Sequence, residues 1–244
     1  MTTNAERSAP HLGMKDRVAA VRERIARAAE RAGRPPGDIT LVAVSKTFPA
    51  TAVREAFAAG VRDFGENKVQ EAEEKAPALL DLAREGLRWH LVGHLQSNKA
   101  RKAAALFDRI HSVDDPALGP RLEKAAAERR RQLPVLVQVD LAGEETKFGL
   151  DEERLFSALD ALRGLKSVHV DGLMVLPPFD ADPERSRPYF RRLRELRDAA
   201  LARNLLTGSH LSMGMSHDLE AAVEEGATLV RVGSAIFGER VKRA

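Results

Sequence analysis

The feature that most constrains the fold of this 244-residue chain is a repeated alternation of strand-like and helix-like segments. Short runs of apolar and β-branched residues predict strands, and they occur at residues 39–45, 61–64, 88–92, 109–113, 134–141, 168–174, 209–211 and 228–232. Between these runs, apolar residues recur three and four positions apart, which predicts helices at residues 50–59, 66–84, 98–107, 116–132, 151–162, 183–204 and 218–225. A further helix is predicted before the first strand, at residues 16–32, where Val18, Val21 and Ile25 have helical spacing.

Eight strand–helix units predict the α/β class and a single closed (β/α)8 TIM-type barrel with an extra N-terminal helix. An open doubly wound sheet is the alternative, because several of the strands are short and weakly marked. No stretch rich in Pro, Gly or Ser divides the sequence. We therefore predict a flexible N-terminus over residues 1–15 and one barrel domain over residues 16–244.

Composition excludes several classes of function. The chain has no cysteine, which excludes disulfides, thiolate nucleophiles and iron–sulfur clusters. The chain has 39 lysine and arginine residues and 36 aspartate and glutamate residues, which gives a net charge of +3. The most basic stretches, residues 129–131 and 185–197, have acidic neighbours. That pattern is typical of solvated helix faces rather than of a nucleic-acid surface. No apolar segment is long enough to span a bilayer and the first ten residues do not resemble a signal peptide, so we expect a cytoplasmic protein that binds neither nucleic acid nor membranes.

In a barrel of this kind the functional residues lie where strands end and the following loops begin. Lys46 directly follows the strongest predicted strand, and alternation places it on the same face as Val42 and Val44. Its amine would then enter the mouth of the barrel, where desolvation favours the uncharged form that can make a Schiff base. The alternative, that Lys46 extends to solvent from the strand end, stays equally open on position alone.

Two loops predict a phosphate site. In such barrels the loops after the seventh and eighth strands frequently bind phosphate together with a helix N-terminus. Here those loops read Ser-Met-Gly-Met-Ser from Ser212 and Gly-Ser-Ala from Gly233. Glycine allows close backbone approach and serine supplies a hydroxyl donor, so the pair of loops favours phosphate binding.

Arg231 interrupts an otherwise apolar predicted strand, Leu-Val-Arg-Val. A buried guanidinium is costly unless it is paired, so we expect Arg231 to face a ligand at the barrel mouth. An internal salt bridge is the alternative. Four other polar strand-end residues are each expected to be structural hydrogen-bonding groups when taken alone: Asn67, His90, His94 and Asn98. The histidines lack metal-ligand spacing, and we expect no metal.

A lysine on the first strand, an arginine on the eighth and a phosphate site in loops 7 and 8 together match one cofactor, pyridoxal 5′-phosphate. The sequence resembles the pyridoxal phosphate homeostasis protein family, whose fold is similar to the N-terminal barrel of alanine racemases. The motifs that carry the resemblance span nearly the whole chain in order: LVAVSKT from Leu41, FGENKVQE from Phe64, WHLVGHLQSNK from Trp89, GLM from Gly172, LSMGMSHD from Leu211 and VRVGSAIFG from Val230.

The resemblance implies roles for individual residues. Lys46 matches the lysine that forms the Schiff base with the cofactor, and Arg231 matches the arginine that faces the pyridine nitrogen. A cation there disfavours protonation of the ring nitrogen and weakens the ring as an electron sink. The full set of cofactor-binding residues that the resemblance implies is Lys46, Asn67, His90, Ser212, Met213, Arg231, Gly233 and Ser234.

The implied function is the buffering or delivery of pyridoxal phosphate, with apo-enzymes as possible recipients and a monomeric state. The first alternative is an amino-acid racemase of low activity. Racemisation needs a second base, which alanine racemases supply as a tyrosine, and the only tyrosine here, Tyr189, lies in a predicted helix. Further alternatives are a Schiff-base aldolase that uses Lys46 directly and an interaction protein that uses its Arg-rich helices.

Overall fold

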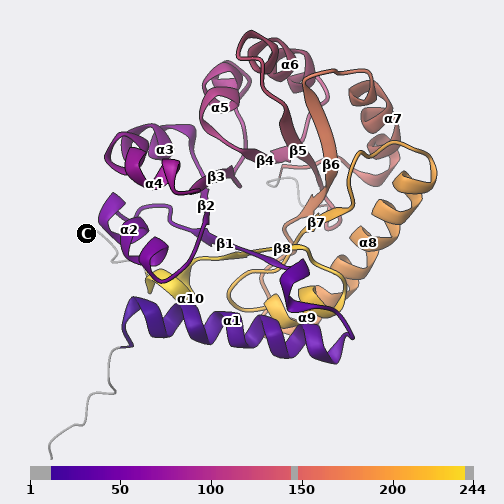
Figure 1. The fold of residues 1–244 in the computed structure, drawn as a ribbon. Helices are drawn as coiled ribbons and strands as arrows, with labels where there is room; N and C mark the ends of the chain where they lie inside the picture. Colours follow the sequence, from indigo (N-terminus) through magenta and orange to yellow (C-terminus); the bar gives the residue numbers. More distant parts are fainter. Residues whose placement is uncertain (1–11, 144–147, 240–244) are drawn as a thin grey trace, which may run out of the picture.

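Eight parallel strands close into a barrel in the computed structural model, which describes residues 12–143 and 148–239 (Figure 1). The strands are β1 (Thr40–Val44), β2 (Asp63–Glu66), β3 (Arg88–Leu91), β4 (Arg109–Val113), β5 (Leu133–Val139), β6 (Val168–Val175), β7 (His210–Ser212) and β8 (Leu229–Val232). Each strand pairs with its sequence neighbour, and β1 also pairs with β8, with Thr40 opposite Leu229. The predicted barrel is confirmed, and the open sheet is excluded because β1 has a partner on both sides.

Helices surround the barrel (Figure 1). They are α1 (Met14–Arg31), α2 (Ala50–Ala58), α3 (Val69–Lys75), α4 (Leu80–Arg84), α5 (Ala100–Leu106), α6 (Leu118–Glu128), α7 (Glu152–Arg163), α8 (Arg187–Ala202), α9 (Leu219–Glu224) and α10 (Ser234–Phe237). Short 3₁₀ turns lie at η1 (Pro36–Asp38), η2 (Ala76–Leu79), η3 (Ser97–Lys99) and η4 (Pro183–Ser186). The extra N-terminal helix is α1, and its buried residues have the helical spacing that predicted it.

The segment after β2 differs from the prediction of one helix over residues 66–84. Glu66 is the last residue of β2, and the helical part is divided into α3, η2 and α4. Pro77 lies in η2, and proline cannot donate the hydrogen bond that a continuous helix requires there. The four-residue helix α10 was not predicted, because one turn is too short to show a helical period.

Apolar residues fill two separate regions. The larger lies between the strands and the surrounding helices, and it includes Phe64, Phe107 and Phe190. A smaller cluster is formed by Val42, Leu136, Met174 and Leu229, from β1, β5, β6 and β8. The smaller cluster is separate from the layer beneath the helices and brings together strands that are not all neighbours, so it lies inside the barrel.

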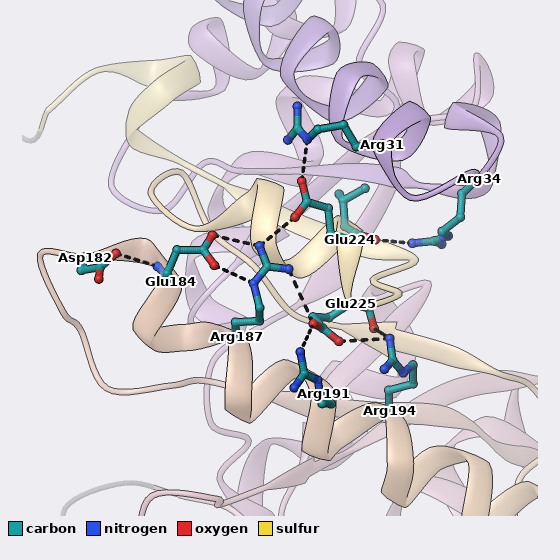
Figure 2. A network of polar contacts seen from close by, with 10 residues as sticks. Arg31, Arg34, Asp182, Glu184, Arg187, Arg191, Arg194, Glu224 and Glu225 are labelled. Carbon is teal, nitrogen blue, oxygen red and sulfur yellow. Dashed lines mark hydrogen bonds and ion pairs between the residues drawn. The ribbon is translucent and has the colours of Figure 1, made fainter.

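Ion pairs join the helices outside β7 and β8 (Figure 2). Arg187 of α8 contacts Glu224 at 2.7 Å and Glu225 at 3.5 Å, and Arg191 contacts Glu225 at 3.0 Å. Arg31 at the end of α1 reaches Glu224 at 2.7 Å. Part of the basic stretch at residues 185–197 is therefore balanced locally by carboxylates, and α1, α8 and α9 are held together.

Residues 1–11 of the predicted flexible N-terminus lie outside the described residues, and α1 begins at Met14, so the division at residues 15 and 16 stays a prediction. In the part of the chain that the structure describes, no helix is both long enough and apolar enough to cross a membrane.

Candidate functional site

A cavity of about 510 Å³ lies at the carboxyl ends of the strands. Five of the predicted site residues line it: Lys46, Asn67, Arg231, Gly233 and Ser234. Apolar and aromatic side chains supply much of the remaining wall, among them Val44, Phe48, Val92, Phe148, Leu176, Phe179 and Met215. A mostly apolar cavity with a few convergent polar groups is typical of a small-molecule site.

Lys46 follows β1 by two residues and lines the cavity together with Val44. Ser45, between them, is fully buried on the opposite side, where its hydroxyl donates to Glu66 at 2.6 Å. The alternation of β1 thus continues past the end of the strand, and it directs Lys46 into the barrel mouth as predicted.

A buried acidic cluster, which was not predicted from the sequence, lies behind this strand end. Glu66 Oε1 accepts hydrogen bonds from Ser45 at 2.6 Å and from Lys75 Nζ at 2.7 Å, and Lys75 also donates to the Ser45 carbonyl at 2.8 Å. Burial, reinforced by the neighbouring carboxyl of Glu71 and opposed by Lys75, raises the pKa of Glu66 to about 7. The signal in the sequence was a charged residue directly after the buried run Phe64-Gly65.

Arg231 on β8 is 4% exposed. Its Nη1 donates to Ser212 Oγ at 2.6 Å and its Nη2 donates to the Val175 carbonyl at 2.9 Å. Both acceptors are uncharged. These two hydrogen bonds therefore do not form the internal salt bridge that was the alternative for Arg231. Burial lowers the pKa of Arg231 to about 10, with the charge of Asp218 acting in the opposite direction, and the guanidinium stays positive at neutral pH.

The loops after β7 and β8 meet at one oxygen atom. The backbone N–H groups of Gly233 and Ala235 both point to Ser216 Oγ, at 3.3 Å each. Two amides that converge on one oxygen form a position that suits a phosphate oxygen. Gly214 has φ +88°, and a Cβ there would lie 2.5 Å from the Ala222 Cβ, so this loop requires glycine.

Three predicted site residues do not line the cavity. Met213 is fully buried in the outer apolar layer, and its N–H donates to the Leu229 carbonyl at 3.1 Å. Strand alternation turns Met213 outward, and Met215 and Ser216 line the cavity instead. Ser212 and His90 are buried and belong to a hydrogen-bonded group that ends at Arg231.

His94 and Asn98 occupy different places. His94 is on the rim of the cavity, where its ring is stacked on Phe148 with the centroids 3.7 Å apart and its Nδ1 lies 2.6 Å from Asp114. Asn98 lines a separate recess beside α5 and α6. Within residues 12–143 and 148–239, no group of three or more His, Asp or Glu side chains is arranged to hold a metal ion.

The alanine racemase N-terminal domain family model matches residues 17–241. The pyridoxal phosphate homeostasis protein of Aquifex aeolicus is 44% identical over 225 residues, which is 92% of this chain and 97% of that protein. The Escherichia coli K12 protein of the same name is 40% identical over 228 residues, covering 91% and 95% of the two chains.

Solved structures of related proteins are also similar to this chain. PipY of Synechococcus elongatus PCC7942, solved with PLP bound, is 42% identical to this chain and superposes on it with a TM-score of 0.81. The match covers 92% of this chain and 100% of the PipY chain. Alanine racemase from Corynebacterium glutamicum has a TM-score of 0.66 at 21% identity, over 93% of this chain and 62% of its own, and shows a similar fold. The predicted resemblance is confirmed: this chain belongs to the alanine racemase N-terminal domain family and, within it, to the pyridoxal phosphate homeostasis proteins.

Proposed function

We propose that this protein binds pyridoxal 5′-phosphate (PLP) at the mouth of its barrel and buffers or delivers it. The observation that carries the proposal is that the amine of Lys46, the guanidinium of Arg231 and the loop at Gly233 and Ser234 line one cavity. Relatives at 40–46% identity bear the name pyridoxal phosphate homeostasis protein, and a relative at 42% identity was solved with PLP bound.

The residues present fit this cofactor. PLP supplies an aldehyde that condenses reversibly with an amine, and Lys46 offers that amine: its Nζ forms a bond to the aldehyde carbon and water leaves. The backbone N–H groups of Gly233 and Ala235, which both donate to Ser216 Oγ in this structure, would donate to the phosphate. Arg231 would donate toward the ring nitrogen and, as a fixed cation, keep that nitrogen unprotonated.

The low-activity racemase is the alternative function. It needs a base on the second face of the ring, and the single tyrosine of the sequence, Tyr189, lies on α8, outside the lining of the cavity. The binding groups alone are enough for a carrier, so we expect no robust racemisation. Incubation with single enantiomers of amino acids, followed by chiral chromatography, distinguishes the two functions. In the proposed role the protein acts as a cytoplasmic monomer and apo-enzymes are its recipients.

The test is an absorption spectrum of the purified protein with added PLP, before and after borohydride reduction, with peptide mapping of the reduced lysine. We expect the label on Lys46 and its loss in Lys46→Ala, where phosphate contacts leave weaker binding. Lys68, an exposed lysine in the recess beside the same cavity, supplies the control, and Lys68→Ala should be labelled like the wild type. A label on another residue, or none, would refute the proposal.

A further inference from the structure

A chain of hydrogen bonds crosses the interior of the barrel and ends at Arg231. Ser212 Oγ accepts from Arg231 Nη1 at 2.6 Å and lies 2.8 Å from His111 Nδ1. His111 Nε2 lies 2.9 Å from His90 Nδ1, and His90 Nε2 lies 2.9 Å from Asp63 Oδ1. The chain thus joins residues of β8, β7, β4, β3 and β2, and because β4 and β7 are not neighbouring strands, it passes through the inside of the barrel.

All five members are almost completely buried. His111 and Ser212 are fully buried, and His90, Arg231 and Asp63 are between 4% and 6% exposed. At the far end Arg88 donates two hydrogen bonds to Asp63, both of 2.7 Å. Buried polar groups that lack partners are costly, so the arrangement of protons along this chain is strongly constrained.

The partners allow one direction of donation that satisfies every group. Arg231 has only donors and the ionised Asp63 has only acceptors, so His90 must donate from Nε2 to Asp63. An uncharged His90 then accepts at Nδ1 from His111 Nε2–H, and His111 accepts at Nδ1 from the Ser212 hydroxyl. In the reverse tautomer of His111, the Ser212 oxygen would receive two donors and its own buried proton would lose the acceptor that the chain provides.

The charges around the chain support this assignment. Burial alone would raise the pKa of Asp63, but hydrogen bonds from His90 and Arg88 outweigh it and lower the pKa to about 2. Burial lowers the pKa of His111 well below its ordinary value, and Arg231 from β8 and Arg109 on β4 itself act in the same direction, as would any positive charge on His90 from β3 or His210 from β7. Asp63 is therefore charged and His111 uncharged at neutral pH.

We propose that His111 and Ser212, oriented from Asp63 through His90, are positioning residues that fix the guanidinium of Arg231 at the cofactor cavity. While His111 accepts the Ser212 proton, the direction of the Ser212 hydroxyl is fixed and its lone pairs are left for Arg231. His111 can accept that proton only while its Nδ1 is free of hydrogen. Asp63 sets that tautomer from the opposite end of the chain. This inference rests on the proposed function, which gives Arg231 its place beside the ring nitrogen.

The first test uses the protein without cofactor, so its outcome is independent of PLP binding. Side-chain ¹⁵N NMR of the histidines distinguishes the two neutral tautomers and the cation. We expect His111 as the neutral Nε2–H tautomer from pH 6 to 8. An Nδ1–H tautomer or a cation at His111 in this range overturns the proposal, even if PLP binds as expected.

The second test measures PLP affinity in folded variants. His111→Leu removes the acceptor for Ser212, and we expect affinity to fall about tenfold, as for one buried hydrogen bond that is lost. His111→Gln, whose amide has both a donor and an acceptor, should stay within about threefold of the wild type. Wild-type affinity in His111→Leu, or equal losses in both variants, contradicts a positioning role.

The matched control is His210→Gln, because His210 is a half-buried barrel histidine that hydrogen-bonds Thr228 at 3.0 Å outside the chain. It should bind PLP like the wild type. If His111→Leu does not fold, Ser212→Ala breaks the same link with a smaller change in volume, and affinity unchanged in that variant overturns the proposal equally.

Discussion

The acidic cluster behind Lys46 predicts that ionisation of Glu66 weakens the fold. Oε2 of Glu66 and Oε2 of Glu71 are buried and have no hydrogen-bond donor among the described residues, while Lys75 supplies one positive charge to the cluster. A proton on Glu66 turns one of these oxygens into a donor and leaves one carboxylate to balance one ammonium. The protonated form is therefore favoured in the folded state, where the pKa of Glu66 rises from 4.5 to about 7.

The sign of the pH dependence follows from this shift. Between pH 4.5 and 7 the folded state holds a proton that the unfolded chain has released, so the free energy of unfolding falls as pH rises. The contribution is complete below pH 4.5 and is lost as pH passes through about 7. At about 1.4 kcal/mol for each tenfold change in proton affinity, the shift from 4.5 to about 7 corresponds to about 3 kcal/mol.

Glu66→Gln imitates the protonated side chain, because its amide oxygen can accept from Ser45 and Lys75 and its nitrogen can donate to Glu71. We expect urea unfolding to give equal stabilities for variant and wild type at pH 4.5, and a variant that is about 3 kcal/mol more stable at pH 8. Glu74→Gln, at an exposed residue of α3, the helix that carries Glu71 and Lys75, is the control and should follow the wild type at both pH values. A difference between Glu66→Gln and the wild type that does not change with pH would refute the reasoning.

Two glycines of the site give further predictions. Gly214→Ala should lower the free energy of unfolding by at least about 3 kcal/mol in urea titrations, because the new methyl meets Ala222 at positive φ, whereas Gly33→Ala, at φ +65° in open space, should cost only about 1 kcal/mol. Gly93→Ala places its Cβ against the backbone carbonyl of Asn67, so the cavity wall must shift and PLP affinity should fall about tenfold or more, as measured by fluorescence titration. Equal stabilities of Gly214→Ala and Gly33→Ala would show that the contact with Ala222 relaxes without cost. Unchanged PLP affinity in Gly93→Ala would show the same for the contact with Asn67.

Most of the barrel could be predicted from the sequence because periodicity is a local signal. The strand around Val42 and the helix around Val21 both follow from spacing alone, and both occur in the structure. Lys46 and Arg231 could be found in the same way, since a strand end and a charge inside an apolar run are visible without a partner.

The parts of the site that could not be predicted depend on contacts between distant strands. His111 and Ser212 are 101 residues apart, and no local pattern indicates that they share a hydrogen bond. The resemblance implies a cofactor-binding role for Met213, and the direction of its side chain, into the outer apolar layer, depends on where β7 ends. Asp63 and Glu66 carry the same signal as Arg231, a charge beside buried residues, but their partners His90 and Ser45 are 27 and 21 residues away, so no local pattern indicates these contacts.

The pairing of β1 with β8 has a consequence for biosynthesis. Lys46 follows the first strand and Arg231 lies on the last, so a nascent chain on the ribosome holds only half of the proposed binding site until the eighth strand emerges. Until then β1 has an unpaired edge. The reactive aldehyde would meet the amine of Lys46 before Arg231 and the loop after β8 are in place. Capture of the vitamin would thus begin only after β8 has emerged and paired with β1, and proteolytic removal of β8 would abolish barrel closure and binding in one event.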